Sequence, residues 1–445
     1  MHDLSTGSIN RHLVGMAAPI AAGMIFQTLY FLVDLYFVGR LGDAAIAGVG
    51  SAGNLAFLVM AITQVLGVGT VALIAQAVGR KDQADANMVF NQSSVLAIAC
   101  LVACLVLGYL FAAHFAAALG SNAATRDAGA TYLHWYLPGL ALQFALVAMG
   151  SALRGTGIVK PAMIAQMLTV VINVMLAPVL IGGWGTGRPM GVAGAGLASS
   201  IAIGVGVLLM WGYFLRLEHY VGFDPHAWIP RLSVWRRILA IGLPAGGEFL
   251  IMFTLVSFIY FVVRPFGTPA QAGFGIGTRV LQAIFLPAMA VAFAVAPIVG
   301  QNYGAGKHAR VRQTFRSAAL MSAGLMLLVM VVCLWRPASL IGGFTSEPEA
   351  IRVGADYLRF VSWNCVASGF VFTCSGVLQG LGNTWPALWS SASRLLTFVV
   401  PVSWLAAQPG FTITQIWIVS VVSVTLQAAL SGMLALRQMR LRLAA

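Results

Sequence analysis

Apolar runs of about 20 residues alternate with short polar breaks along almost the whole chain. A run of that length crosses the hydrocarbon core of a bilayer as one α-helix, which needs about 20 apolar residues. A long regular series of such runs excludes an outer-membrane β-barrel and a protein with a single anchor. The pattern predicts an all-α polytopic membrane protein. Twelve transmembrane helices are predicted, centred near residues 26, 60, 100, 142, 171, 203, 250, 285, 326, 368, 396 and 424.

Composition and charge agree with this interpretation. Of the 445 residues, 60% are hydrophobic and 8% are charged, which is too few charges to cover a soluble globule. The net charge of +13 lies in the short breaks, so it indicates membrane topology and predicts no nucleic-acid partner. With the N-terminus inside, the inner breaks hold sixteen basic residues and the outer breaks seven. The positive-inside rule then predicts a multi-pass protein of the plasma membrane, here a bacterial inner membrane, with both termini cytoplasmic.

The chain repeats itself at an offset of 225 residues without a gap, and eight glycine pairs coincide. Each copy holds six spans, so both copies enter the membrane in the same orientation and form a parallel pseudo-two-fold repeat. We expect a six-helix lobe at residues 1–215, a cytoplasmic linker at 216–237 and a second six-helix lobe at 238–445. Two facing bundles suit an alternating-access transporter, and two fused bundles without a pathway are the alternative. The repeated positions include Pro19 and Pro244, Gly48 and Gly273, Gln76 and Gln301, Tyr132 and Tyr357, Gly155 and Gly380, and Pro161 and Pro386.

Two of the twelve acidic residues, Asp34 and Glu248, lie inside predicted spans. A carboxylate there costs about 2.5–3.5 kcal/mol on insertion scales, so it is a functional candidate. At 1.5 Å per residue, Asp34 lies roughly 6 Å from the outer end of its span and Glu248 roughly 15 Å along the seventh span. Burial favours the neutral form of a carboxyl group, so either acid is a candidate proton carrier. The alternatives are that Asp34 bonds to the outer loop and that Glu248 packs in an ion pair with Arg279 or Arg394.

Uncharged polar residues at membrane depth are candidates for a substrate cavity. Gln27 and Tyr30 precede Asp34 by seven and four residues and share its helical face. Gln166 and Asn173 are also seven residues apart and share a face of the fifth span. Hydrogen bonding between helices is the alternative for each of these residues. The predicted substrate-cavity residues are Gln27, Tyr30, Gln64, Gln166, Asn173 and Gln282.

Pro19 and Pro244 occupy the same repeat position inside helices, where proline removes a backbone hydrogen bond and kinks the axis. Such a kink is a candidate two-state element, and a static bend is the alternative. The five cysteines lie in apolar runs without a C-x-x-C motif, and no nucleophile, Walker or zinc motif is present. The sequence therefore predicts no enzyme, no metal and no cofactor. Without an ATP-binding motif, an ion gradient must supply the energy for transport.

Several motifs resemble those of the multidrug and toxic compound extrusion (MATE) family. The stretch from Pro19 through Asp34 to Gly48 reads P-x(14)-D-x-x-x-x-G-x-L-G-x-x-A-x-A-G. The second copy carries GQNYGAGK at Gly300–Lys307 and GVLQGLGNT at Gly376–Thr384. The likeness covers nearly the whole chain. It implies a two-lobed antiporter that expels small amphipathic, often cationic, compounds in exchange for protons or sodium.

The same resemblance assigns roles to single residues. Asp34 matches the first-helix acid implicated in cation coupling, Pro19 the bending proline, and Glu248 a seventh-helix acid of many members. Ala177 stands where the DinF-like branch often carries an acid. Ser368 stands where NorM-like members place an acid associated with sodium, so its identity favours protons over sodium.

The resulting hypothesis is competition between drug and ion at Asp34. The ionised acid binds an organic cation from the inside, and a proton arriving from outside neutralises the acid and releases the cation. Glu248 is the candidate for a second proton. The expected partners are small amphipathic cations, H+ or Na+ and the lipid bilayer, with the protein acting as a monomer. The alternatives are a flippase for lipid-linked oligosaccharides and, from another class, a membrane-embedded enzyme or scaffold.

Overall fold

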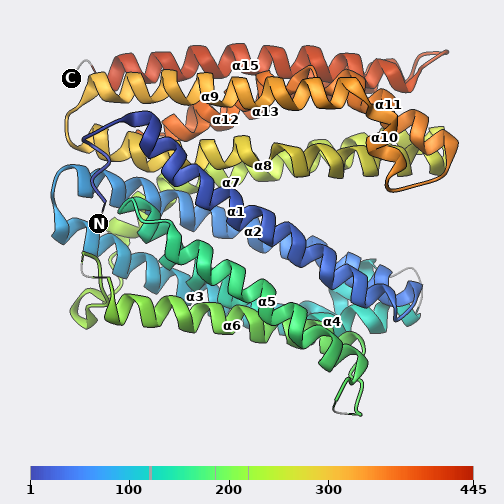
Figure 1. The fold of residues 1–445 in the computed structure, drawn as a ribbon, viewed down its shortest axis with the longest axis horizontal. Helices are drawn as coiled ribbons and strands as arrows, with labels where there is room; N and C mark the ends of the chain where they lie inside the picture. Colours follow the sequence, from blue (N-terminus) through green and yellow to red (C-terminus); the bar gives the residue numbers. More distant parts are fainter. Residues whose placement is uncertain (1, 120–122, 186, 219, 444–445) are drawn as a thin grey trace. The chain divides into compact units, whose positions relative to one another are not determined.

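The computed structural model describes residues 2–119, 123–185, 187–218 and 220–443. Side chains at a few positions in α1 to α3 also lie outside this description, and Asp34 is one of them. All regular structure in the described residues is helical (Figure 1). The long helices are α1 Ile9–Gly39, α2 Asp43–Gly79, α3 Gln83–Leu119, α4 Ala123–Gly155, α5 Lys160–Gly182, α6 Val192–Arg216, α7 Leu232–Val263, α8 Thr268–Gly304, α9 His308–Trp335 and α15 Ile413–Leu443. The shorter elements are η1 Pro225–Ala227, η2 Arg264–Phe266, α10 Pro337–Gly342, α11 Pro348–Val361, α12 Asn364–Gly380, α13 Trp385–Arg394, η3 Leu395–Val399 and α14 Val400–Ala406.

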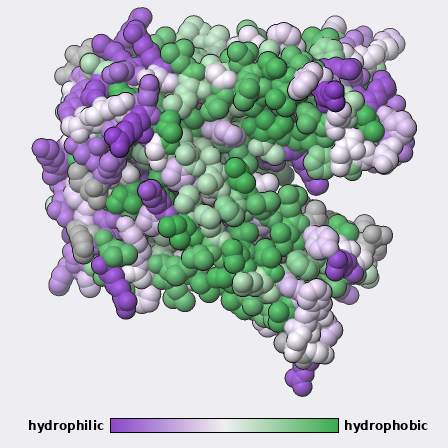
Figure 2. All heavy atoms as spheres, in the orientation of Figure 1, coloured by the Kyte–Doolittle hydropathy of each residue, from purple (hydrophilic) through white to green (hydrophobic). Residues whose placement is uncertain are grey.

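The predicted spans correspond to these helices. Ten helices in the described part of the chain are long and apolar enough to cross a membrane. The pair α11 and α12, bent by 56°, makes an eleventh span, and α13, η3 and α14 follow one another without a break from Trp385 to Ala406. Each of the twelve predicted centres lies in one of these helices, which confirms the predicted fold class. Apolar side chains cover the middle of the visible helices, and polar side chains gather toward their ends (Figure 2).

The described chain divides into two compact units that exchange the beginnings of two helices. Unit 1 comprises residues 1–3 and 22–242, and unit 2 comprises residues 4–21 and 243–445. The start of α1 therefore belongs to unit 2, and the start of α7 belongs to unit 1. The changes of unit fall close to Pro19 and Pro244. These units differ from the expected ranges of 1–215, 216–237 and 238–445, because the helix beginnings pack with the other half of the sequence.

Glycines bring the helices of each unit into close contact at repeated positions. A Cβ atom built at Gly155 would lie 2.8 Å from Ile74 Cγ2, and one at Gly380 would lie 2.7 Å from Val299 Cβ. Both the glycines and their neighbours are 225 residues apart. The repeat in the sequence is thus also a repeat of helix packing inside each unit.

The two units differ in the helices that correspond to α4 and α5. Where unit 1 has the continuous helix α4, unit 2 has the bent pair α11 and α12. Where unit 1 has the continuous helix α5, unit 2 has α13, a π-helical segment η3 and α14. Unit 2 is therefore the more irregular of the two.

The connection before α7 is bound to α3 and is not a loose linker. Asn91 Nδ2 donates to the Gly222 carbonyl oxygen at 2.9 Å, and Gln92 Nε2 donates to the Ala227 carbonyl oxygen at 2.7 Å. These buried amides satisfy backbone groups that have no partner within a helix.

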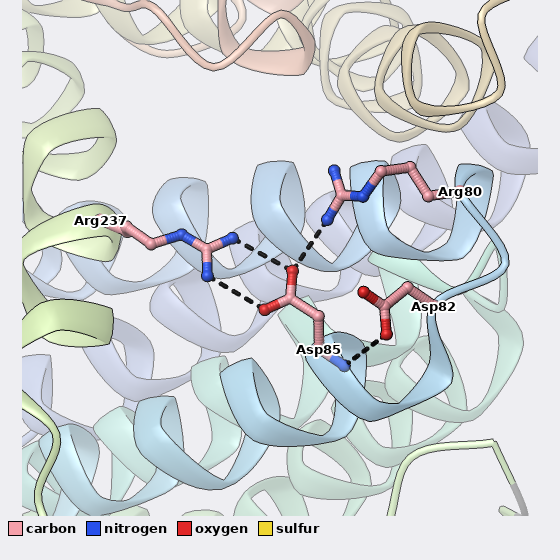
Figure 3. Close-up of polar contacts among 4 residues, drawn as sticks. All are labelled: Arg80, Asp82, Asp85 and Arg237. Atoms are coloured by element: carbon pink, nitrogen blue, oxygen red, sulfur yellow. Dashed lines mark hydrogen bonds and ion pairs between the residues drawn. The ribbon is translucent and has the colours of Figure 1, made fainter.

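An ion-pair cluster holds the start of α7 against the start of α3 (Figure 3). Asp85 lies between two arginines: Arg237 Nη1 is 3.0 Å from Oδ1, and Arg80 Nη2 is 2.8 Å from Oδ2. Asp82 caps α3, because its Oδ1 accepts the Asp85 backbone N–H at 3.0 Å. All four residues belong to unit 1.

Candidate functional site

Unit 2 contains a cavity of about 140 Å³ around Glu248. Side chains from α7, α8, α12, α13 and α15 form its walls, so the broken helices α12 and α13 contribute directly. The walls combine aromatic and methionine side chains, which adapt to apolar ligands, with a small polar group of residues. The lining residues are Glu248, Phe249, Ile251, Met252, Leu255, Met289, Ala292, Phe293, Ser368, Val371, Phe372, Ser375, Gly376, Gln379, Ser391, Arg394 and Gln427.

The Glu248 carboxyl group accepts hydrogen bonds from two serines on different helices. Ser375 Oγ of α12 donates to Oε2 at 2.8 Å, and Ser391 Oγ of α13 donates to Oε1 at 3.2 Å. Gln379 and Gln427 donate in turn to these two hydroxyl oxygens, each at 3.3 Å. A buried carboxyl group with neutral donors can hold or release a proton without breaking an ion pair.

The ion-pair alternative for Glu248 is not what the structure contains. Among the described residues, Glu248 makes no salt bridge with Arg279 or Arg394. Arg279 is an exposed residue of α8 and does not line the cavity, whereas Arg394 does. Glu248 therefore faces a protein-lined space, and its role in coupling stays a prediction.

The other candidate residues lie mainly in unit 1. Gln27 and Tyr30 belong to α1, Gln64 to α2, and Gln166 and Asn173 to α5. Asn173 is fully buried, and its Nδ2 lies 3.3 Å from Ser199 Oγ of α6. Asn173 thus makes the kind of interhelical hydrogen bond that was the alternative to a cavity role. The grouping of these five residues around one cavity stays a prediction.

The repeat relates this group to the cavity of unit 2. An offset of 225 pairs Gln27, Tyr30, Gln64 and Gln166 with Met252, Leu255, Met289 and Ser391 in that order. All four counterparts line the Glu248 cavity. Four of the five residues predicted for unit 1 therefore occupy positions that line a cavity in the other copy, whereas the counterpart of Asn173, Phe398, does not line it.

Four further candidates have different outcomes. The backbone of Asp34 lies in α1, but its side chain lies outside the described residues. Gln282 is exposed on α8 and is not among the residues that line the Glu248 cavity, so the structure does not bring it to this site. Pro19 and Pro244 both lie inside helices, α1 and α7, as predicted.

Six polar residues that line the cavity were not among the predicted site residues: Ser368, Ser375, Gln379, Ser391, Arg394 and Gln427. The repeat could have indicated two of them. Ser391 is the counterpart of Gln166, a predicted cavity residue, and Arg394 is the counterpart of Thr169, a polar residue three positions further along the same helix. Serine is common in transmembrane helices, so Ser375 had no distinctive signal. Within the described residues, no three His, Cys, Asp or Glu side chains are grouped as a metal site would require.

Comparison with known proteins agrees with the fold. The MatE family model matches residues 19–179 and again 244–405, and the two matches begin at the repeated prolines. The chain is 26% identical over 422 residues to the probable multidrug resistance protein YpnP of Bacillus subtilis, covering 94% of this chain and 91% of that protein. It is 27% identical over 401 residues to the probable multidrug resistance protein NorM of Thermotoga maritima, covering 89% and 85%.

A solved structure shares the whole architecture. The crystal structure of MATE in complex with MaL6 superposes with a TM-score of 0.92 at 23% identity, covering 100% of this chain and 99% of that one. The two family-model matches together cover more than half of the chain, one in each copy of the repeat. This protein is therefore a member of the MATE family of multidrug efflux transporters, and it is a transporter and not an enzyme.

Proposed function

We propose that this transporter exports small amphipathic organic cations in exchange for protons, with Asp34 as the principal proton carrier and Glu248 as a second proton site. The observation that carries the proposal is the Glu248 carboxyl group, which lies in a largely apolar cavity and is bound by neutral hydroxyl groups. An acid in such surroundings can change its charge as the cavity opens to each side. The counterparts of the predicted unit-1 residues support a similar cavity near Asp34.

The lining of the cavity favours protons over sodium. A hard cation prefers several oxygen ligands with carboxylates among them. Glu248 is the single carboxylate among the described residues that line this cavity, and the position associated with sodium in the NorM-like branch is held by Ser368. A proton needs only one such group.

The number of protons exchanged sets the driving force for transport. One pH unit corresponds to about 1.4 kcal/mol, or tenfold accumulation for each proton exchanged. Exchange of one monovalent cation for one proton moves no net charge. A second proton at Glu248 makes the exchange electrogenic, and each charge then gains about 2.3 kcal/mol per 100 mV of membrane potential.

Topology and assembly belong to the same proposal. The protein lies in a bacterial inner membrane with both termini in the cytoplasm, supported by the sixteen inner and seven outer basic residues. It works as a monomer, because each compact unit already buries its own core.

Everted vesicles, with a fluorescent organic cation added to the outside medium, test the proposal. An imposed pH gradient drives uptake in the wild type, and Asp34→Asn abolishes this pH-driven uptake. Glu248→Gln retains uptake but loses its acceleration by membrane potential. Asp127→Asn, which changes an exposed acid near the start of α4, serves as the matched control and behaves as wild type. Unchanged pH-driven uptake in Asp34→Asn, or uptake driven by a sodium gradient alone, contradicts the proposal.

A further inference from the structure

Arg394 brings a positive charge to the Glu248 cavity. It is the last residue of α13, lines the cavity, and stacks its guanidinium over the Phe398 ring at 5.7 Å from the ring centre. Its Nε is buried and has no hydrogen-bond partner among the described residues. No carboxylate in the described part of the chain forms an ion pair with it.

An unpaired guanidinium at this depth is costly. Arginine inside a membrane helix is energetically unfavourable, and buried arginines are normally paired. The group carries five N–H donors in a fixed plane and no acceptor. Glu248, the one carboxylate among the described residues that line the cavity, is already bound by Ser375 and Ser391. The donors of Arg394 are therefore available to whatever enters the cavity.

The backbone beside Arg394 is also unusual. The π-helical segment η3, Leu395–Val399, begins immediately after Arg394, and Pro401 follows without an N–H to donate. Short π-helical segments inside α-helices are frequent at functional sites. In unit 1 the helix α5 is continuous, and the counterpart of Arg394 is Thr169, whose hydroxyl donates to its own helix backbone at Gln166. The buried arginine and the π-helical segment thus occur together in unit 2. At the corresponding positions α5 has a neutral threonine and a continuous α-helix.

From these observations we infer that the unit-2 cavity binds the carboxylate of a small aromatic acid through Arg394. Guanidinium groups bind carboxylates with two parallel hydrogen bonds. A planar carboxylate therefore matches the donors of Arg394 better than a spherical anion does. The cavity volume of about 140 Å³ suits one aromatic ring, since an engineered cavity of roughly 150 Å³ holds benzene. Phe249, Phe293 and Phe372 provide the apolar walls for that ring. The binding site stands independently of transport, and its place on a substrate pathway rests on the proposed export function.

Titration of the purified full-length protein with 4-fluorobenzoate, followed by ¹⁹F NMR, tests the inference. The neutral isostere 4-fluorobenzamide reports binding that does not need the carboxylate. We expect the wild type to bind the benzoate more tightly than the amide. Arg394→Gln is expected to weaken benzoate binding about tenfold or more, with little effect on the amide, because it removes charge-assisted hydrogen bonds. Arg279→Gln, the matched loss of an exposed arginine in unit 2, leaves both affinities unchanged.

Equal binding of benzoate and benzamide by the wild type overturns the inference, as does wild-type benzoate affinity in Arg394→Gln. If Arg394→Gln does not fold, Arg394→Lys decides the matter. Lysine keeps the charge but loses the planar pair of donors, so a clear loss of benzoate affinity supports the inference and an unchanged affinity overturns it. Export of the fluorescent cation is measured separately in vesicles. Loss of cation export with intact benzoate binding therefore counts against the proposed function alone.

Discussion

The close contact at Gly273 makes a quantitative test of helix packing possible. A Cβ atom at Gly273 in α8 would lie 2.5 Å from the Ala350 carbonyl oxygen of α11, whereas ordinary contacts begin at 3.4 Å. A backbone oxygen cannot rotate away, so the two helices would have to separate by about 0.9 Å. Overpacking costs roughly 1–3 kcal/mol, and alanine in place of a helical glycine recovers up to about 1 kcal/mol. A contact of 2.5 Å with a backbone atom falls in the upper part of that range, roughly 2–3 kcal/mol. After the gain of up to about 1 kcal/mol, Gly273→Ala is expected to lower the free energy of unfolding by about 1–2 kcal/mol.

The repeat supplies a matched variant in the other unit. At Gly48 in α2, a Cβ atom would lie 2.7 Å from the Gly129 backbone nitrogen of α4, so Gly48→Ala is expected to destabilise the protein in the same direction. Gly324→Ala is the control, because a Cβ atom there meets no atom within 4 Å. Thermal unfolding of the purified variants in detergent measures all three. A midpoint for Gly273→Ala equal to that of Gly324→Ala would refute the reasoning from close contact.

Two further substitutions test polar contacts. Asp85→Asn removes both ion pairs of the cluster at the start of α7 and is expected to lower the free energy of unfolding by about 1 kcal/mol, since the groups are partly exposed. In the same melting assay Glu349→Gln, which changes an exposed pair, serves as its control and has no measurable effect. Ser375→Ala removes one of the two hydrogen-bond donors of the Glu248 carboxyl group and is expected to lower the free energy of unfolding by about 1–3 kcal/mol. Ser368 lines the same cavity without a hydrogen bond to Glu248, so Ser368→Ala is the control and should leave the free energy of unfolding unchanged. If Ser375→Ala destabilises the Glu248→Ala variant as much as the wild type, the loss does not depend on Glu248 and this account is wrong.

The helices were predictable because the length of an apolar run is a local property of the sequence. The breaks in the helices were not. The bend between α11 and α12 falls at Ser362 and Trp363, where neither proline nor glycine marks it. The counterpart of Trp363 in unit 1 is Pro138, which lies inside the continuous helix α4. Tertiary packing therefore keeps α4 continuous although it contains a proline, and it bends the pair α11 and α12 where no proline is present.

The site was predictable only where a charge stands out from apolar surroundings. Glu248 was found in this way. Its donors Ser375 and Ser391 were not, because a serine in a membrane helix can bond its own backbone equally well. Gln282 is exposed on α8 and does not line the Glu248 cavity, so its role in binding substrate stays a prediction. Projection of one repeat onto the other would have improved the prediction more than any single motif.

The exchanged beginnings of α1 and α7 bear on how such a chain can be divided. In unit 1 the start of α7 packs so closely on α2 that a Cβ atom at Gly242 would collide with the Val65 backbone, and one at Gly69 with that of Ile238. In unit 2, Lys307 Nζ donates to the Ser5 carbonyl oxygen at 2.8 Å just before α1. Neither half of the polypeptide, expressed by itself, contains all the parts of its own bundle. A polypeptide that contained one copy of the repeat would therefore have to pair with a second copy, which would supply the start of the first helix of its bundle.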